Sequence, residues 1–157
     1  MRQLCLIVLL MLPAAAALAD FTAGLQAFDA GDYETALAEW RPLAEAGDGE
    51  AQLALAGLYM QGVGVGRDPA RAAQWYLRAA RQGLVMAQLN LGDLHARGLG
   101  VRRDPVQAYR WLELAARQNH AWARNRRDQL AGAMTPAQID EARRLADGFR
   151  AETGSSR

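Results

Sequence analysis

Apolar residues recur three and four positions apart in two stretches near the middle of the chain, 51–61 and 87–97. This spacing places them on one face of a helix, so both stretches are predicted to be amphipathic α-helices. A second helix is predicted after each of them, over 69–82 and 105–118. Both of these begin with an Asp-Pro pair, in which the aspartate can cap free amide groups and proline fits the first helical position.

Glycines separate the two helices of each predicted pair. Gly62-Val63-Gly64 and Gly98-Leu99-Gly100 lie where the first helix must end, and glycine readily adopts the positive φ that a helix terminus and a tight loop require. Gln107 stands three residues after Asp104, which is the spacing of a capping box. The pattern therefore predicts two helix-loop-helix units.

The two units are copies of one another at a distance of 36 residues. A shift by 36 places Ala51-Gln52-Leu53 on Ala87-Gln88-Leu89 and Arg67-Asp68-Pro69 on Arg103-Asp104-Pro105. The shift also matches Leu55, Leu58, Ala72, Trp75 and Ala79-Ala80-Arg81-Gln82 with Leu91, Leu94, Ala108, Trp111 and Ala115-Ala116-Arg117-Gln118. A period of this length is typical of proteins built from stacked repeats.

The flanking segments continue the same plan. Ala36, Ala44 and Gly47 stand 36 residues before Ala72, Ala80 and Gly83. Residues 121–132 are predicted to form another first helix. Thr135-Pro136 opens a last helix that reaches about residue 150 and carries a polar side, as the end of a repeat stack requires.

The pattern Ala51…Leu55…Leu58-Tyr59…Gly62-x-Gly64-Val65…Asp68…Ala72…Trp75-Tyr76…Ala79-Ala80…Gly83 begins again at Ala87 and resembles the Sel1-like repeat, a relative of the tetratricopeptide repeat. Three positions depart from it: Ala56 replaces a glycine, His95 replaces a tyrosine and Asn119 replaces Gly83. The resemblance implies an all-α, right-handed α-solenoid. We expect units at about 21–49, 50–85 and 86–121, a capping region at 122–150 and a flexible tail at 151–157.

The N-terminal residues predict export. A charged start, an apolar run from Leu4 to Leu12 and the small-residue site Ala17-Leu18-Ala19 have the form of a secretory signal peptide over residues 1–19. The remaining alternative is an uncleaved anchor. We expect cleavage after Ala19 and a periplasmic or secreted bacterial protein. Because the chain has one cysteine, Cys5, the mature protein then lacks cysteine and relies on apolar burial without disulfides.

The residue inventory argues against catalysis and metal binding. The serines are Ser155 and Ser156, the chain has no lysine, and the histidines are His95 and His120. A serine–lysine site or a cysteine–histidine site cannot be assembled from this set, and a metal site would need more ligands at suitable spacing. A pair of carboxylates such as Asp93 and Glu113 remains as an alternative, but the shallow grooves of a repeat solenoid do not offer the dry pocket that raises a catalytic pKa. We therefore predict no enzymatic activity and no cofactor, with His95 as a partly buried packing residue. The glycine loops also lack the basic residue of a phosphate-binding loop, and nucleic acid is not an expected partner.

The aromatic residues are assigned to the core. Trp75 and Trp111 recur at the repeat period on the apolar side of the second helix, as core residues do. Trp40 and Tyr59 are interpreted in the same way.

The resemblance implies that a partner segment binds in a concave groove lined by the first helix of each pair. The groove residues are then those turned away from Leu55 and Tyr59, a mixture of apolar anchors and polar groups suited to a protein interface. They are Leu25, Phe28, Leu53, Gly57, Met60, Gln61, Leu89, Asp93, Arg97, Asn125 and Gln129. The leading hypothesis is a non-catalytic interaction scaffold for a peptide segment or an envelope protein.

An arginine cluster supports the alternative hypotheses. Every basic residue is arginine, and residues 20–50 hold eight acids against one arginine, whereas the region from Arg97 to Arg127 holds eight arginines against Asp104 and Glu113. The eight are Arg97, Arg102, Arg103, Arg110, Arg117, Arg124, Arg126 and Arg127. This patch is either a solvated face or a docking surface for an anionic partner such as an envelope polysaccharide. Self-association through the terminal helices is the third possibility.

Overall fold

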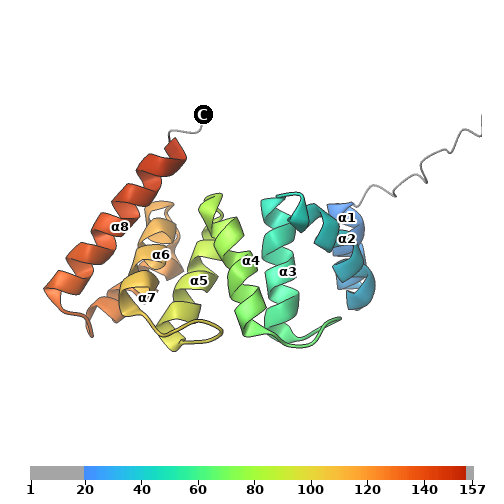
Figure 1. Cartoon of the computed structure of the whole chain (residues 1–157), viewed down its shortest axis with the longest axis horizontal. Helices are drawn as coiled ribbons and strands as arrows, with labels where there is room; N and C mark the ends of the chain where they lie inside the picture. Colours follow the sequence, from blue (N-terminus) through green and yellow to red (C-terminus); the bar gives the residue numbers. More distant parts are fainter. Residues whose placement is uncertain (1–19, 155–157) are drawn as a thin grey trace, which may run out of the picture.

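The computed structural model describes residues 20–154, with side chains to residue 149, and this part of the chain folds into eight α-helices stacked in a row (Figure 1). The predicted signal peptide lies outside the described residues. The helices are α1 (Phe21–Asp29), α2 (Tyr33–Glu45), α3 (Gly49–Gln61), α4 (Pro69–Arg81), α5 (Val85–Arg97), α6 (Pro105–Arg117), α7 (Ala121–Ala131) and α8 (Pro136–Gly154). None of the helices in this range is both long and apolar enough to span a bilayer.

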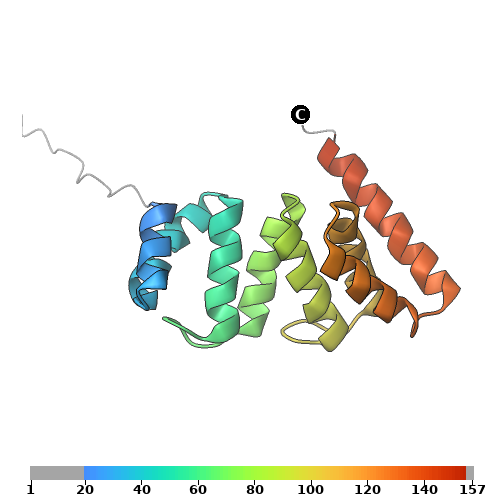
Figure 2. The ribbon, with the colours of Figure 1, turned by 180° about the vertical axis from the view of Figure 1, so that it is seen from behind.

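Each helix packs against the next one from α1 to α7, which confirms the predicted α-solenoid. Seen from behind, the stack again runs from α1 and α2 at one end to α8 at the other (Figure 2). The first helix of each pair, which we call the A helix, is α1, α3, α5 or α7. The second helices α2, α4 and α6 are the B helices.

The predicted helix starts at Asp68 and Asp104 are confirmed. Asp68 Oδ1 accepts a hydrogen bond from the amide of Arg71 at 2.9 Å, and Asp104 Oδ1 accepts from the amide of Gln107 at 3.1 Å. The expected capping box at Gln107 is wrong. The amide of Asp104 donates to the carbonyl oxygen of His95 at 2.9 Å, and the Gln107 side chain accepts from Arg110 instead.

Two buried glutamines join successive units. Gln52 Nε2 donates to the carbonyl oxygen of Ala44 at 3.1 Å, while Gln52 Oε1 accepts from Gln82 at 2.9 Å. The same bonds return 36 residues later, where Gln88 donates to Ala80 at 3.3 Å and accepts from Gln118 at 3.0 Å. Each buried amide therefore connects the end of one B helix to the end of the next.

The four aromatic residues assigned to the core lie in it or pack against it. Trp40, Tyr59 and Trp111 are each 3% exposed, and alanines such as Ala36 and Ala72 are fully buried where helices approach closely. Trp75 differs from its repeat partner Trp111, because it is only partly buried and borders a surface pocket. Trp75 packs against the core, as predicted, but one side of its ring stays open to the pocket.

The loops between the paired helices have the backbone conformation predicted from their glycines. Gly64 and Gly100 have φ of +65° and +70°. Gly64 lies against Tyr33 at the start of α2, and Gly100 lies against Pro69 at the start of α4, so closely that neither site has room for a Cβ atom. Asn119, which replaces Gly83, adopts the left-handed conformation itself, with φ of +63°. Asparagine tolerates this region better than most residues.

The last helix packs differently from the B helices before it. It lies mainly against α6, where Phe149 meets the ring of Trp111 edge-on at a centroid distance of 5.3 Å. Ala142 and Ala146 are fully buried and lie on the side of this capping helix that packs against the solenoid. The helix continues to Gly154, beyond residue 150, so residues 151–154 of the predicted tail are helical, while 155–157 lie outside the described residues.

Candidate protein-binding surface

Two large apolar side chains stand exposed at the same position of neighbouring A helices. Met86 is the second residue of α5 and is 46% exposed, and Trp122 is the second residue of α7 and is 52% exposed. They are 36 residues apart and therefore occupy the same repeat position on two successive A helices. Contiguous exposed apolar groups often mark an interaction site.

Charged and polar side chains continue from this apolar pair along the same helix faces, because residues three or four positions apart share one side of a helix. Asp93 Oδ1 lies 2.8 Å from Arg126 Nη2, which links α5 to α7, and Asp93 Oδ2 lies 3.1 Å from Arg97 Nη1. The Arg126 guanidinium also stacks over the ring of Trp122 at 5.7 Å. We define the A-helix face as Met86, Asp93, Arg97, Trp122, Arg126 and Gln129.

The structure supports the predicted exposure of most polar groove residues. Gln61, Arg97, Asn125 and Gln129 are exposed, and Asp93 is partly exposed. Gly57 is open as well, since a Cβ atom added there would meet only Gln61 at 4.0 Å. Leu25 on α1 is 43% exposed.

Most of the predicted apolar groove residues are less exposed than expected. Leu89 is only 4% exposed, because it packs with Leu112 and the small residues of α6 and α7, so its assignment to an open groove is wrong. Leu53 and Met60 are partly buried against the main core. Phe28 is partly buried too, with its ring 5.2 Å from that of Tyr33 and 5.7 Å from that of Trp40. These three side chains contribute mainly to packing.

The sequence interpretation missed Met86 and Trp122. Leu53 and Leu89 occupy one repeat position, and the exposed face lies to the side of it, along Met86, Asp93 and Arg97. A signal was available, since Met86 and Trp122 are large apolar residues matched by the 36-residue shift. Trp122 also stands in a helix that is otherwise rich in arginine.

Much of the predicted arginine patch is occupied by internal ion pairs. Glu113 is 9% exposed and lies 2.8 Å from Arg117 and 2.7 Å from Arg127, and Arg117 also reaches Asp147 of α8 at 2.6 Å. Burial alone would raise the pKa of Glu113, but these two guanidinium groups outweigh it and hold the pKa below its ordinary value. This charge cluster fastens α6, α7 and α8 together.

The other arginines of the patch have different surroundings. Arg97 and Arg126 share Asp93, as described above. Arg103 donates to the carbonyl oxygen of Ala96 at 3.2 Å, and Arg110 stacks on Trp111 at 4.8 Å. Arg102 and Arg124 are exposed. The cluster is therefore not one uniform positive surface.

The two histidines have structural roles. His120 Nδ1 accepts from the amide of Ala123 at 3.2 Å and caps α7. His95 is partly buried, as predicted, and burial lowers its pKa, although its surroundings include a backbone hydrogen bond with Arg102 and the charge of Asp104. No group of three or more metal-ligating side chains occurs among residues 20–149.

Comparison with known proteins identifies the repeat. The Sel1 repeat model matches residues 49–84 and 85–120, which cover α3 to α6 and agree to within a residue with the units predicted from the 36-residue period. A comparison with curated proteins finds no match.

Solved structures show the same fold. One is c5321, a protective antigen present in uropathogenic Escherichia coli strains and displaying an SLR fold, which is 32% identical over 80% of this chain with a TM-score of 0.77. Another is a Sel1 repeat protein from Oxalobacter formigenes, 30% identical over 83% of this chain with a TM-score of 0.69. This chain spans 28% and 56% of the length of those two structures.

Proposed function

We propose that this chain, which contains two matches to the Sel1 repeat, is a non-catalytic, exported scaffold that holds a segment of a partner protein on the A-helix face. The exposure of Met86 and Trp122 at one repeat position carries the proposal. Tryptophan, methionine and arginine are enriched at protein interfaces, and tryptophan and arginine are frequent energetic anchors. The A-helix face brings these residue types together.

The charges of the A-helix face suit a polar rim around the apolar pair. Asp93 holds Arg126 and Arg97 through its two oxygens, so these side chains are positioned before a partner arrives. Side chains that are already ordered lose less conformational entropy on binding. Export is supported by the signal-peptide pattern of residues 1–19.

Site-specific photo-crosslinking in the native cell envelope tests the proposal. A photoreactive phenylalanine analogue would replace Met86 or Trp122, and the same analogue at the exposed positions Asp140 and Arg143 of α8 would serve as the matched control. We expect one discrete protein adduct from positions 86 and 122 and none from the controls.

Other outcomes would contradict the proposal. Adducts from the control positions alone would place binding on another surface. The absence of any protein adduct, together with salt-sensitive retention on an anionic polysaccharide, would favour the arginine-mediated alternative, since ion pairing weakens with ionic strength. Recovery of the native protein with its first residues intact in the cytoplasm would remove the export claim.

A further inference from the structure

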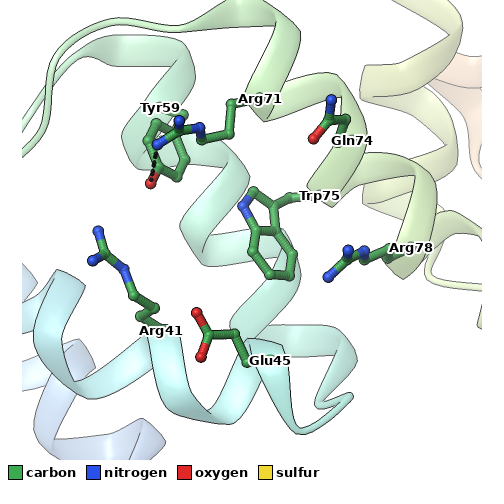
Figure 3. Close-up of a pocket in the computed structure, with 7 residues that line it drawn as sticks. All are labelled: Arg41, Glu45, Tyr59, Arg71, Gln74, Trp75 and Arg78. Atoms are coloured by element: carbon green, nitrogen blue, oxygen red, sulfur yellow. Dashed lines mark hydrogen bonds between the residues drawn. The ribbon is translucent and has the colours of Figure 1, made fainter.

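A pocket of about 290 Å³ lies between α2, α3 and α4, away from the helices that carry the A-helix face. Figure 3 shows Trp75 pointing from α4 toward Arg41 and Glu45 of α2, with Arg78 beside its ring. Tyr59 of α3 and Arg71 close the other side of the pocket. A tryptophan ring surrounded by arginines thus faces an open space.

The repeat supplies a filled counterpart of this arrangement. Trp111, 36 residues after Trp75, is buried, and Phe149 of α8 meets its ring at 5.3 Å. The Arg110 guanidinium lies over both rings, 4.8 Å from that of Trp111 and 5.5 Å from that of Phe149. Arginine and two aromatic rings that meet edge to face therefore form one cluster at the C-terminal end of the solenoid.

Trp75 also has an arginine beside its ring, although from another repeat position than Arg110, and it lacks a second aromatic ring. The Arg78 guanidinium lies 4.5 Å from the centre of the Trp75 ring, but no second aromatic ring contacts Trp75 among the described residues. A cation that lies beside two aromatic rings is attracted by both of them, and this attraction is stronger where water is excluded. The open side of the Trp75–Arg78 pair can accept an aromatic side chain.

The charges around the pocket favour a ligand that carries a negative charge next to its aromatic ring. Arg41 and Arg78 have no carboxylate within 4.0 Å among the described residues, and Arg71 has only Asp68, at 3.6 Å. A hydrogen bond of 3.3 Å to the Tyr59 hydroxyl holds Arg71 in place. Against these three guanidinium groups the pocket presents one carboxylate, that of Glu45.

The covering segment of α8 has this same chemistry. Asp147 stands two residues before Phe149. Asp147 forms an ion pair with Arg117 at 2.6 Å, and the ring of Phe149 contacts that of Trp111. An acidic side chain close to an aromatic one is thus the combination that this chain uses to cover its own tryptophan and arginine surface.

We propose that the Trp75 pocket is a second binding site, which takes a short segment of a partner protein with an aromatic side chain beside a carboxylate. The aromatic ring packs on Trp75 and Arg78, and the carboxylate binds Arg41 or Arg71. This site goes beyond the function proposed for the A-helix face, because the two surfaces lie on different helices and can fail independently.

The indole N–H signals of the protein in ¹⁵N NMR spectra provide the test, with N-acetyl-Asp-Gly-Phe-amide as the probe. We expect the peptide to shift the Trp75 indole signal in a saturable manner and to leave those of Trp111 and Trp122 unchanged. Peptides with Asn for Asp or Leu for Phe should bind about fivefold to tenfold more weakly, from the loss of one charge-assisted bond or one aromatic contact.

Protein variants complete the test. Arg41→Gln and Arg78→Gln should each weaken binding of the acidic peptide, whereas Arg143→Gln on α8 is the matched control and should not. All three sites are exposed, and an unchanged Trp111 signal reports that the fold is intact. Equal binding of the Asn peptide, or a shift of Trp122 alone, would overturn the proposal. A shift of the Trp75 signal with protein concentration alone would assign the pocket to a second copy of the chain and would also overturn it.

Discussion

Gln82 donates a hydrogen bond to Gln52 at 2.9 Å across 30 residues of sequence, and Gln118 does the same to Gln88 at 3.0 Å. Gln52 and Gln88 are 4% and 2% exposed, so these amides are buried between units and depend on their partners. A buried polar group without a partner costs about 1–3 kcal/mol.

The first prediction concerns this repeated amide contact. Gln88→Leu removes one hydrogen bond from the carbonyl oxygen of Ala80, which still accepts from the amide of Gly83, and one from Gln118, which still donates to the carbonyl oxygen of Gly83. Because both groups keep a partner, we expect a loss of about 1 kcal/mol in the free energy of unfolding. Gln74→Leu, at an exposed position of α4, should change it by less than about 0.5 kcal/mol. Urea denaturation of both variants measures the difference. Equal stability of the two variants would mean that the buried amide contributes nothing.

The second prediction concerns Glu113, which joins α6 to α7 through Arg127. Glu113→Ala removes one carboxylate from each of two partly buried guanidinium groups. Arg117 keeps Asp147 and Arg127 keeps Asp128, so we expect a loss of about 1–2 kcal/mol, less than for a buried ion pair whose partner is left alone. Since the folded state lowers the pKa of Glu113, its contribution is complete above the ordinary carboxyl pKa and is lost as the pH falls through the folded value.

Thermal unfolding between pH 3 and pH 7 checks both statements about Glu113. The wild-type protein should approach the stability of Glu113→Ala at the acid end of this range. Glu141→Ala is the matched control, because Glu141 pairs with Arg144 on the surface of α8, where an exposed ion pair adds little to stability.

The third prediction concerns His95, whose pKa is lowered by burial. The unfolded chain therefore binds a proton at a higher pH than the folded protein does, and stability falls as the pH drops below the ordinary histidine pKa. We expect the melting temperature of the wild-type protein to fall more between pH 7 and pH 5.5 than that of His95→Gln. His120 is present in both proteins, so the difference isolates His95. Parallel curves for the two would contradict this role.

The fourth prediction compares the two repeat-related tryptophans. Trp111→Ala removes a buried ring that contacts Phe149, and we expect a loss of about 3–5 kcal/mol. Trp75→Ala removes a partly buried ring at the edge of a pocket, and we expect about 1–2 kcal/mol, since less apolar surface returns to water. Equilibrium unfolding measures the free energy of unfolding of both variants and tests this difference. A larger loss for Trp75 would contradict the observed difference in packing.

Local signals predicted most of the fold from the sequence. Asp68 and Asp104 mark helix starts because their caps depend on neighbouring amides, and Gly64 and Gly100 mark loops because of their backbone conformation. The 36-residue period then fixed the order of the units. Such features depend on residues close in sequence, which is why they could be recognised without a structure.

The candidate site was harder to predict because it depends on contacts between units. Leu53 and Leu89 share one repeat position, yet α6 and α7 bury Leu89 while Leu53 keeps some exposure. Trp75 and Trp111 likewise match in sequence and differ in burial, because α8 covers only Trp111. Neither the rotation of a helix about its axis nor the resting place of a terminal helix follows from the repeat alone.

The close packing of Gly64 on Tyr33 and of Gly100 on Pro69 allows the protein to gain or lose whole repeats during evolution. Both loops reach back by 31 residues to the start of the preceding B helix, so the same junction recurs in every internal unit. The contact that a loop requires is therefore offered by any neighbour of the same kind. Gain or loss of a whole 36-residue unit restores the contact between a loop glycine and the start of the preceding B helix. An insertion or deletion of any other length leaves one loop without this contact.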